Sequence, residues 1–336
     1  MLAFIFLAAI MVVPAQAQFR VISADDSQPI AGAYVFDASG KLLSQSTSEG
    51  LVEKISGMVS VSAMGYESQK VDATTFCGDL TLKSKTFVLP EVNITKAEYT
   101  KLTTAFRDIF RSNGKTVLYR EGYADYYVNM KNKKTTRRIR CCRQYEKPGL
   151  RKMSTFSTTI FDVNSVNLSK VNSLKAGSVS KVSGDSTFVS TSYHGRSSDK
   201  AVIYIDMHRD DIFRQIIDDT KLSKTEHNIL GMKLSMKKNI LDWTMSDKSS
   251  TIQSLLAFRN IKDYIWSFSS KDTAQVEVVQ DVVMTDCISI SKKEAQAEMK
   301  DKDVATDFTL PESLPDIPYD IPTETEGLKQ TAFWER

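Results

Sequence analysis

Apolar and polar residues alternate in two short stretches near the start of the chain. Residues 33–36 and 59–63 each place every second side chain on a common face, with valine and alanine at the inward positions. A period of two is typical of a strand with one buried face. Turn signals at Ser39-Gly40 and Glu49-Gly50 follow at intervals of about ten residues, as in an all-β sandwich. We therefore predict a small β-sandwich over residues 18–90.

A different period begins after a predicted linker at residues 91–95. Five apolar residues recur at the three- and four-residue spacing of one helix face. Thr95 and Glu98 have the spacing of a capping box, and Gly114 can end the helix. The pattern predicts a helix over residues 95–113 that docks on a sheet. Its apolar face consists of Leu102, Ala105, Phe106, Ile109 and Phe110.

Residues 116–146 have the pattern of a long hairpin. A strand rich in tyrosine and valine at 117–130 leads to a turn at 131–133, and a return strand follows at 135–145.

Strand-like and helix-like runs alternate from residue 178 to residue 303. We predict a hairpin at 178–193 around Gly184-Asp185, because this dipeptide favours a tight turn. Two short helices are predicted, one at 210–221 and one at 291–302, the second with Ser291 and Glu294 at capping-box spacing. The first of these helices would turn inward Ile212, Phe213, Ile216 and Ile217. Further strands are predicted at 79–82, 87–89, 201–206, 229–246, 261–268 and 274–290.

These elements define the expected fold class. The chain is mainly β, with an immunoglobulin- or transthyretin-like sandwich followed by an α+β domain over residues 96–303 whose sheet is largely antiparallel. A large curved sheet with a few helices would resemble the periplasmic lipoprotein carriers. Residues 304–336 form a tail that holds four of the eight prolines. Such a segment favours extended geometry and cannot enter the interior of a sheet. Phe333-Trp334 at its end would dock on the domain or on a partner.

Three segments of the N-terminal part carry a more specific pattern: Pro29-Ile30-Ala31-Gly32-Ala33-Tyr34-Val35, Thr47-Ser48-Glu49-Gly50 and Val59-Ser60-Val61-Ser62-Ala63-Met64-Gly65-Tyr66. They resemble the carboxypeptidase-regulatory-like domain, and the match covers roughly a fifth of the chain. One departure is Leu51-Val52-Glu53, where the family usually has an aromatic residue after the glycine. The resemblance implies a scaffold or recognition role, since this module has no catalytic residues of its own in its family. Residues 89–95 resemble the link that follows the same module in TonB-dependent outer-membrane transporters, which implies a Gram-negative envelope origin.

The first residues favour export. An apolar run at 2–13 precedes Ala15-Gln16-Ala17, so we predict a signal peptide over residues 1–17 and a mature chain that begins at Gln18. The run is too short for a bilayer, which takes about 20 residues. No second run approaches spanning length, so we expect no transmembrane segment after removal of the signal. The expected location is periplasmic or outer-membrane associated, and the alternative for the run is a buried N-terminal helix.

The overall charge says little, because 44 basic and 41 acidic residues give a net charge of +3. Only the local distribution of charge is informative. Basic residues interleaved with tyrosines gather in the hairpin and can bind an anionic ligand or a membrane surface. An exported protein rarely meets nucleic acid, so we expect an envelope protein or an anionic lipid or glycan as partner. The alternative is a solvated strand face whose charges pair across the hairpin with Glu121 and Asp125. The candidate binding residues are Lys133, Lys134, Arg137, Arg138, Arg140 and Arg143.

Motifs of known chemistry are missing from the sequence, which has no HExxH, GxSxG, phosphate-binding loop or GxGxxG after a strand. We therefore predict no catalytic residue, cofactor or metal. His194, Asp206, His208 and Asp210 could frame a metal site only with an unfixed spacing, and His227 stands apart, so surface histidines are the simpler interpretation.

The four cysteines show no CxxC spacing. Export would permit a disulfide. Two interpretations stay open: buried thiols, or one bridge from Cys141 or Cys142 to Cys287, while Cys77 lies in the other domain.

Three hypotheses follow for the function. The first is a non-enzymatic envelope protein that serves as a scaffold or recognition module for a partner or an anionic ligand. The second is a carrier of a lipid or lipoprotein in a curved sheet, which an apolar concave face would favour. The third is an envelope hydrolase with its site within residues 96–303, around His194, Asp206 and His208.

Overall fold

The computed structural model describes residues 19–53, 55–87, 92–93, 97–148, 179–183, 186–193, 196–209, 212–218, 226–229, 232–247, 251–267, 273–301, 303–316 and 327–332. These residues are mainly β, as predicted, and they hold one short α-helix. None of their helices is long and apolar enough to cross a membrane.

Residues 19–87, here called the N-terminal unit, form two small sheets around one apolar core. In the first sheet β1 (Phe19–Ser23) lies between β4 (Leu51–Val52) and β7 (Gly78–Leu82). The second sheet has the order β3 (Leu42–Gln45), β2 (Tyr34–Asp37), β5 (Met58–Ser62), β6 (Gln69–Asp72). Both sheets contribute valines to the shared core, which explains the alternation at 33–36 and 59–63.

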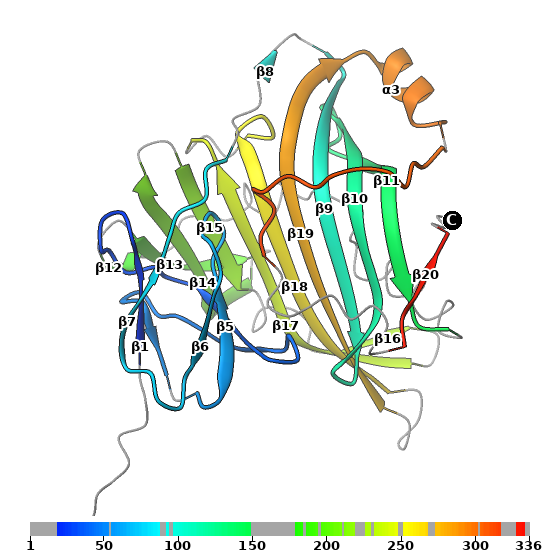
Figure 1. The fold of residues 1–336 in the computed structure, drawn as a ribbon. Coiled ribbons are helices and arrows are strands. Elements are labelled where there is room, and N and C mark those ends of the chain that lie inside the picture. Colours follow the sequence, from blue (N-terminus) through cyan, green and yellow to red (C-terminus); the bar gives the residue numbers. More distant parts are fainter. Residues whose placement is uncertain are drawn as a thin grey trace, which may run out of the picture.

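The rest of the chain builds one sheet of 13 strands (Figure 1). Neighbours on its main path are antiparallel, and the short β8 (Val92–Asn93) pairs parallel to β19 within the predicted linker. A second short strand, β16 (Glu226–Ile229), pairs with β17. The order along the main path is β12 (Val179–Ser183), β13 (Ser186–Tyr193), β14 (Arg196–Arg209), β15 (Ile212–Asp218), β17 (Met232–Met245), β18 (Leu255–Ser267), β19 (Thr273–Ile290), β9 (Tyr99–Ser112), β10 (Lys115–Asn129), β11 (Thr135–Glu146), β20 (Lys329–Thr331).

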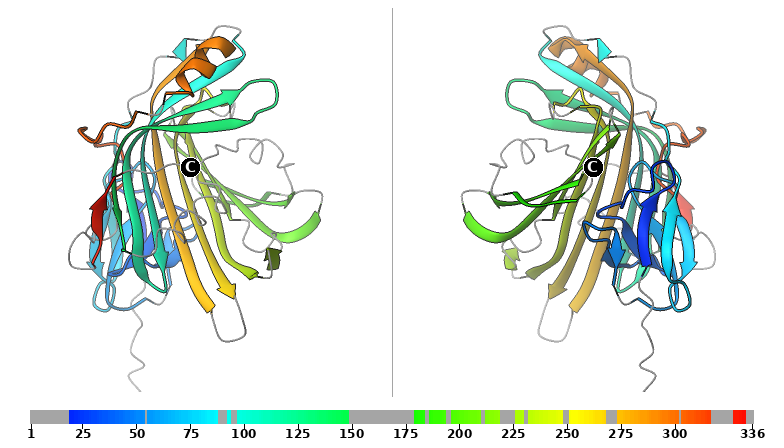
Figure 2. Two further views of the ribbon diagram at one scale, coloured as in Figure 1. Left: turned by 90° about the vertical axis from the view of Figure 1, so that its right-hand side faces the viewer. Right: turned by 90° about the vertical axis from the view of Figure 1, so that its left-hand side faces the viewer.

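The large sheet is strongly curved, and the N-terminal unit lies on its convex side (Figure 2). Side chains alternate between the two faces, so each long strand serves both. In β9, Ile109 packs with Tyr34 and Phe36 of the N-terminal unit and is therefore on the convex face. Phe106 and Phe110 belong to other apolar clusters and point to the concave face.

The predicted helix at 95–113 is wrong: its described residues form β9, and Asn113 and Gly114 make the turn to β10 with positive φ. Both faces of this strand are buried. Leu102, Phe106 and Phe110 fill the concave face, while Ala105 and Ile109 fill the convex one. Two alternating sets offset in this way produce the three- and four-residue spacing that is typical of a helix.

The predicted helix at 210–221 is wrong for the same reason. Its described residues 212–218 form β15, which pairs with β14 and β17. Phe213 packs in the concave cluster and Ile216 in the convex one, so apolar residues again occur on both faces of a strand.

Other predicted elements are confirmed. The 116–146 hairpin is β10 and β11, the 178–193 hairpin is β12 and β13, and the remaining strand-like runs of the large sheet are β14, β17, β18 and β19. Strand β7 covers 79–82, whereas Phe87 lies outside any strand. Helix α3 (Lys292–Glu298) begins with the predicted capping box, in which Ser291 accepts from the Glu294 amide and the Glu294 carboxylate accepts from the Ser291 amide. Residues 1–17, 149–175 and 333–336 lie outside the described part of the chain.

The proline-rich tail returns to the convex side. Leu314 packs with Met64 and Phe87 of the N-terminal unit, and Asp316 pairs with Lys85 at 3.0 Å. Strand β20 then adds to the outer edge of β11.

Candidate functional site

The six basic residues predicted as a binding surface are divided between the turn and the two faces of the hairpin. Lys133 and Lys134 are exposed in the turn. Arg138 donates from Nε to the carbonyl of Met299, the residue that caps the C-terminal end of helix α3. Only Arg137 points to the concave face, where it is 4% exposed. These positions therefore do not form one solvent-facing basic surface.

The remaining two arginines make the cross-strand pairs that the alternative interpretation expected. Arg140 Nε lies 2.8 Å from the Asp125 carboxylate, and Arg143 Nη2 lies 3.1 Å from that of Glu121. Both acids belong to β10, so much of the charge of β11 is balanced within the hairpin.

A buried row of polar side chains crosses the concave face, and sequence reasoning missed it. Its five members come from five adjacent strands and lie opposite one another in the register. All five are buried. The polar row consists of Gln144 in β11, Arg120 in β10, Asp108 in β9, Gln280 in β19 and Asn260 in β18.

Hydrogen bonds join the polar row around the Asp108 carboxylate. Arg120 Nε donates to it at 2.7 Å and Gln280 Nε2 at 3.1 Å. Asn260 Nδ2 in turn donates to Gln280 Oε1 at 2.8 Å. Arg137, near the start of β11, donates a further hydrogen bond from Nη1 to Asp108 at 3.0 Å. One carboxylate thus serves two guanidinium groups.

The protonation of Asp108 follows from these neighbours. Burial by itself would raise the pKa of this carboxyl, but Arg137 and Arg120 outweigh burial and hold the pKa below its ordinary value. The pKa of Arg137 is raised, because Asp108 outweighs the effect of burial on the guanidinium. Asp108 is therefore ionised at neutral pH, between two guanidinium groups.

Several polar atoms of this face have no hydrogen-bond partner within the described part of the chain. They include Arg120 Nη2 and the side-chain oxygens of Gln144 and Asn260, all in the polar row. Trp243 Nε1 is a fourth such atom, and its side chain is 2% exposed. Buried polar groups without partners are uncommon in native proteins, so three such atoms in one row distinguish it from the apolar clusters beside it.

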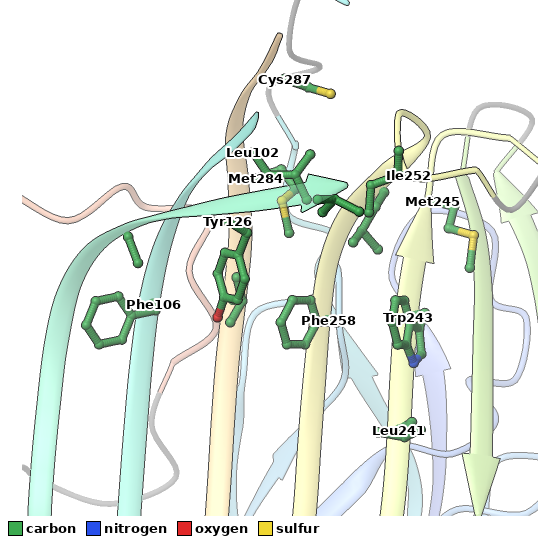
Figure 3. Close-up of a cluster of buried hydrophobic side chains, with 14 of the residues drawn as sticks. Leu102, Phe106, Tyr126, Leu241, Trp243, Met245, Ile252, Phe258, Met284 and Cys287 are labelled. Carbon is green, nitrogen blue, oxygen red and sulfur yellow. The ribbon is translucent and has the colours of Figure 1, made fainter. Parts of the chain in front are cut away.

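Apolar side chains flank the polar row on both sides. One cluster includes Trp243, which stacks on Phe258 with ring centroids 5.7 Å apart, and Tyr126, which meets Phe258 edge-on (Figure 3). Arg137 lies 4.1 Å above the ring of Phe106 in the same cluster. The other cluster lies beyond the row and consists of Phe110, Val117, Leu118, Leu234, Tyr264, Trp266, Val276 and Val278.

A bulge in β11 brings the polar row and Arg137 to the same face. Arg137 and Gln144 are seven residues apart, so a regular strand would point them to opposite faces. The register of β10 with β11 shifts by one residue at Arg140, so that Arg137 and Gln144 point to the same face. Gly122 faces this bulge, and a Cβ atom there would collide with the Cys141 carbonyl oxygen.

The convex face is also rich in buried arginines, but each of the two central ones has its own carboxylate. Arg214 donates two hydrogen bonds to Asp242, at 3.0 and 2.8 Å. Its remaining donors reach the backbone carbonyls of Ala31 and Gly32 in the N-terminal unit, each at 3.2 Å. Tyr34 adds a hydrogen bond from its hydroxyl to Asp242 at 3.1 Å.

The second central pair of the convex face is Arg259 with Asp281. Arg259 donates from Nε at 2.5 Å and from Nη2 at 3.0 Å to that carboxylate. It also reaches Ser62 Oγ of the N-terminal unit at 3.2 Å. The N-terminal unit is therefore fixed to the sheet by charged and apolar contacts together.

All four cysteines are free thiols, so the bridge to Cys287 is not formed. Two strands, β9 and β10, separate Cys142 in β11 from Cys287 in β19. Burial raises the pKa of Cys142 to about 12 and that of Cys287 to about 11.

The hypothetical metal and hydrolase site cannot be placed from the described side chains. His194 and Asp210 lie outside the described residues, and β14 is described by its backbone alone, including Asp206 and His208. Among the side chains that are described, no group of three or more His, Cys, Asp or Glu residues could hold a metal ion.

Neither a scan against protein-family models nor a search of curated proteins found a match.

Proposed function

We propose that this chain is an exported, non-enzymatic envelope protein whose curved sheet binds an amphipathic ligand on its concave face. Export is supported by the apolar run and the Ala15-Gln16-Ala17 site. An envelope origin is supported by the resemblance of the N-terminal unit and of residues 89–95 to modules of envelope proteins.

The observation that carries this proposal is the composition of the concave face. Aromatic and aliphatic side chains lie on both sides of the polar row. Within the row, three polar atoms have no hydrogen-bond partner in the described part of the chain. Apolar surface with a few convergent polar groups is typical of sites for small amphipathic molecules. The convex face cannot serve in the same way, because the N-terminal unit and the tail cover it.

The carrier hypothesis is thereby favoured over binding through the basic hairpin. Arg140 and Arg143 are paired with acids of β10, and Arg137 is buried. A basic membrane-binding surface would need these charges in solvent. The exposed Lys133 and Lys134 are too few to replace them.

The N-terminal unit is best interpreted as a carboxypeptidase-regulatory-like sandwich that braces the sheet. Its two sheets around one core support the sandwich. Its contacts with Arg214 and Arg259 support a fixed position on the convex face. A brace of this kind holds the curvature on which the concave face depends.

Tryptophan quenching tests the proposal directly. The chain has three tryptophans, and Trp243 and Trp266 both lie on the concave face. A Trp334→Phe background leaves only these two as reporters. Dibromostearic acid and its methyl ester quench tryptophan on contact, and we expect saturable quenching by at least one of them.

Single-tryptophan variants supply the control. In Trp243→Phe and Trp266→Phe versions of the same background, the remaining residue reports one side of the polar row. Unbrominated stearate should compete and restore the fluorescence. Absence of saturable quenching with both probes would contradict a concave binding site.

A further inference from the structure

Residues 307–316 of the tail, here called the tail segment, lie across the convex side of the large sheet. The segment follows Ala305, which bridges to Cys141 at the edge of β11, and it crosses toward β18 (Figure 1). It contains no helix or strand, and only Leu314 and Pro315 within it are buried. The tail segment is therefore attached to the fold at a few points and is otherwise accessible to solvent.

Three side chains of the sheet and the N-terminal unit hold the tail segment by its backbone. Each donates a hydrogen bond to a backbone carbonyl: Tyr123 to Thr309 at 2.8 Å, Lys85 to Glu312 at 3.3 Å and Arg107 to Pro315 at 2.5 Å. Every residue has such a carbonyl, so these bonds do not depend on the side chains of the segment. The same donors are therefore suited to another peptide that follows the same path.

Arg107 is positioned for its contact by the sheet itself. Its Nε donates to the Tyr119 hydroxyl at 3.0 Å, and that hydroxyl donates to the Glu121 carboxylate at 2.6 Å. Burial raises the pKa of Tyr119, so the hydroxyl keeps its proton and remains a donor. Strands β9 and β10 thus fix the guanidinium group, and a donor that is already in place loses little entropy when a peptide binds.

Two leucine–proline pairs provide the apolar anchors of the tail segment. Leu310-Pro311 and Leu314-Pro315 lie on either side of a turn, which a hydrogen bond from the Leu314 amide to the Pro311 carbonyl closes at 3.2 Å. Both leucines pack in one cluster with Met64 and Phe87 of the N-terminal unit. Proline restricts the backbone of the free peptide, so less conformational entropy is lost on binding.

Charge and an aromatic ring define the ends of the tail segment. The segment has three acidic residues and no basic one, and Asp316 pairs with Lys85 at 3.0 Å. At the other end the ring of Phe308 meets that of Tyr123 edge-on, with 6.1 Å between the centroids. The Arg143 guanidinium lies 4.6 Å from the centroid of the same Phe308 ring. A peptide that suits this surface is therefore acidic and has an aromatic residue before its first leucine.

The contacts of the tail segment are more exposed than those of the N-terminal unit. Arg214 and Arg259 hold the N-terminal unit from buried positions. By contrast, the Asp316 side chain is 49% exposed in its pair with Lys85, and the hydrogen bond from Tyr123 is also exposed. Exposed bonds of this kind are replaced by bonds to water at little cost. The tail segment can therefore leave the surface while the N-terminal unit stays in place.

We propose that the side chains that hold the tail segment form a recognition site for a partner protein, and that the tail segment occupies this site in the free chain. The site, here called the tail site, consists of Lys85, Arg107, Tyr123 and Arg143. The partner supplies a segment with the same chemistry, which is acidic and has two leucine–proline pairs. The tail segment is thus an internal competitor that the partner displaces. This inference does not depend on the ligand of the concave face, because the tail site lies on the opposite face of the sheet.

A partner protein is favoured over the tail of a second copy. In each copy the tail segment lies between two attached points, the bridge of Ala305 to β11 and the pairing of β20 with β11. An exchange between copies would have to break these attachments, whereas a separate peptide replaces the tail segment alone.

The test measures binding of a fluorescently labelled peptide, with the sequence of residues 307–316, to the full mature chain. In the parent the tail segment competes at a high effective concentration, so the peptide should bind weakly. Leu314→Ala removes a buried anchor of the competitor and leaves the tail site unchanged, so the peptide should bind this variant at least about tenfold more tightly. Fluorescence anisotropy measures both affinities. Equal affinity for the two chains, or binding to neither, would overturn the proposal.

Two further changes in the Leu314→Ala background locate the site. Arg107→Gln removes the positioned donor, so it should weaken peptide binding about tenfold. Arg20→Gln is the matched control, because Arg20 pairs with Asp79 within the N-terminal unit, and it should bind the peptide as the background does. An Arg107→Gln chain that binds as tightly as the background would overturn the assignment of Arg107 to the tail site.

Phe308→Ala covers the case in which Leu314→Ala fails to fold, since Phe308 is only half-buried. Its loss weakens the internal competitor, so the peptide should bind this variant at least about twofold more tightly than the parent. Unchanged affinity in this variant would also overturn the proposal. Sedimentation of the parent chain should show a monomer. A dimer that the free peptide dissociates would assign the site to a second copy and overturn its assignment to a partner protein.

Discussion

The two faces of the large sheet use the same side chains in different ways. On the convex face Arg214 and Arg259 each meet one carboxylate and then bind the N-terminal unit. On the concave face Arg120 and Arg137 meet the one carboxylate of Asp108. Arginines on the convex face therefore join two parts of the chain, whereas those on the concave face converge on one carboxylate within the large sheet.

The largest effect should come from the centre of the polar row. Asp108→Asn removes the carboxylate that two buried guanidinium groups share, and we expect it to cost about 3–5 kcal/mol of unfolding free energy at neutral pH. The pKa of Asp108 is below its ordinary value, so its contribution is present above about pH 4 and is lost as the pH falls through the folded pKa. Urea unfolding from pH 7 to pH 3 measures both quantities.

The parent chain serves as the reference for this pH series. Its stability should fall more steeply below about pH 4 than that of Asp108→Asn, because only the parent has this carboxylate to protonate. If the stability of both proteins fell equally as the pH was lowered, Asp108 would not be held ionised by the arginines.

Breaking a matched pair on the convex face should have the next largest effect. Arg259→Met leaves the Asp281 carboxylate buried without its partner, at a cost of about 3 kcal/mol. The double variant Arg259→Met/Asp281→Leu removes both charges and should recover most of this loss. Limited proteolysis would show whether the N-terminal unit stays docked. A double variant as unstable as the single one would mean that the pair does more than neutralise charge.

A smaller effect tests the bulge that sets the concave face. Gly122→Ala places a methyl group against the Cys141 carbonyl, so we expect a loss of about 1–3 kcal/mol. Gly114→Ala is the comparison, since that glycine has a positive φ but no atom near its missing side chain. Thermal unfolding of both variants measures the difference. A Gly122→Ala protein as stable as the parent would contradict the tight approach of the two strands.

The smallest effect belongs to the exposed turn of the hairpin. Lys133 and Lys134 lie in solvent, so changing both to glutamine should alter stability by less than about 0.5 kcal/mol. The same variant should bind probe ligands and anionic vesicles as the parent does. A salt-dependent loss of vesicle binding would restore the basic hairpin as a functional surface.

Much of the fold was predictable where a strand buries one face or alternates cleanly. The hairpin of β10 and β11 and the capping box of Ser291 and Glu294 followed from local pattern. Strands β9 and β15 did not, because both of their faces are buried and their apolar spacing is that of a helix. Local pattern cannot distinguish these cases without knowing how many layers the fold has.

The candidate site could not be predicted for a different reason. Asp108 and Gln280 are 172 residues apart in the chain, and only the register of β9 with β19 brings them together. Arg137 was predicted as part of a solvent-facing surface, and the bulge at Arg140 turns it inward instead. One clue was present in the sequence: Asp108 lies two residues from both Phe106 and Phe110, so on a strand it shares their apolar face, where a charge needs a partner.

Thiol labelling of the native chain, with and without stearate, tests the central claim most directly because the cysteines report separate places. Cys77 is exposed on the N-terminal unit, and Cys142 and Cys287 are buried on the concave face. At a stearate concentration about a hundred times its Kd, we expect labelling of both buried thiols to slow at least about tenfold. Labelling of Cys77 should not change. Unchanged rates at Cys142 and Cys287 under saturating ligand would contradict a binding site on the concave face.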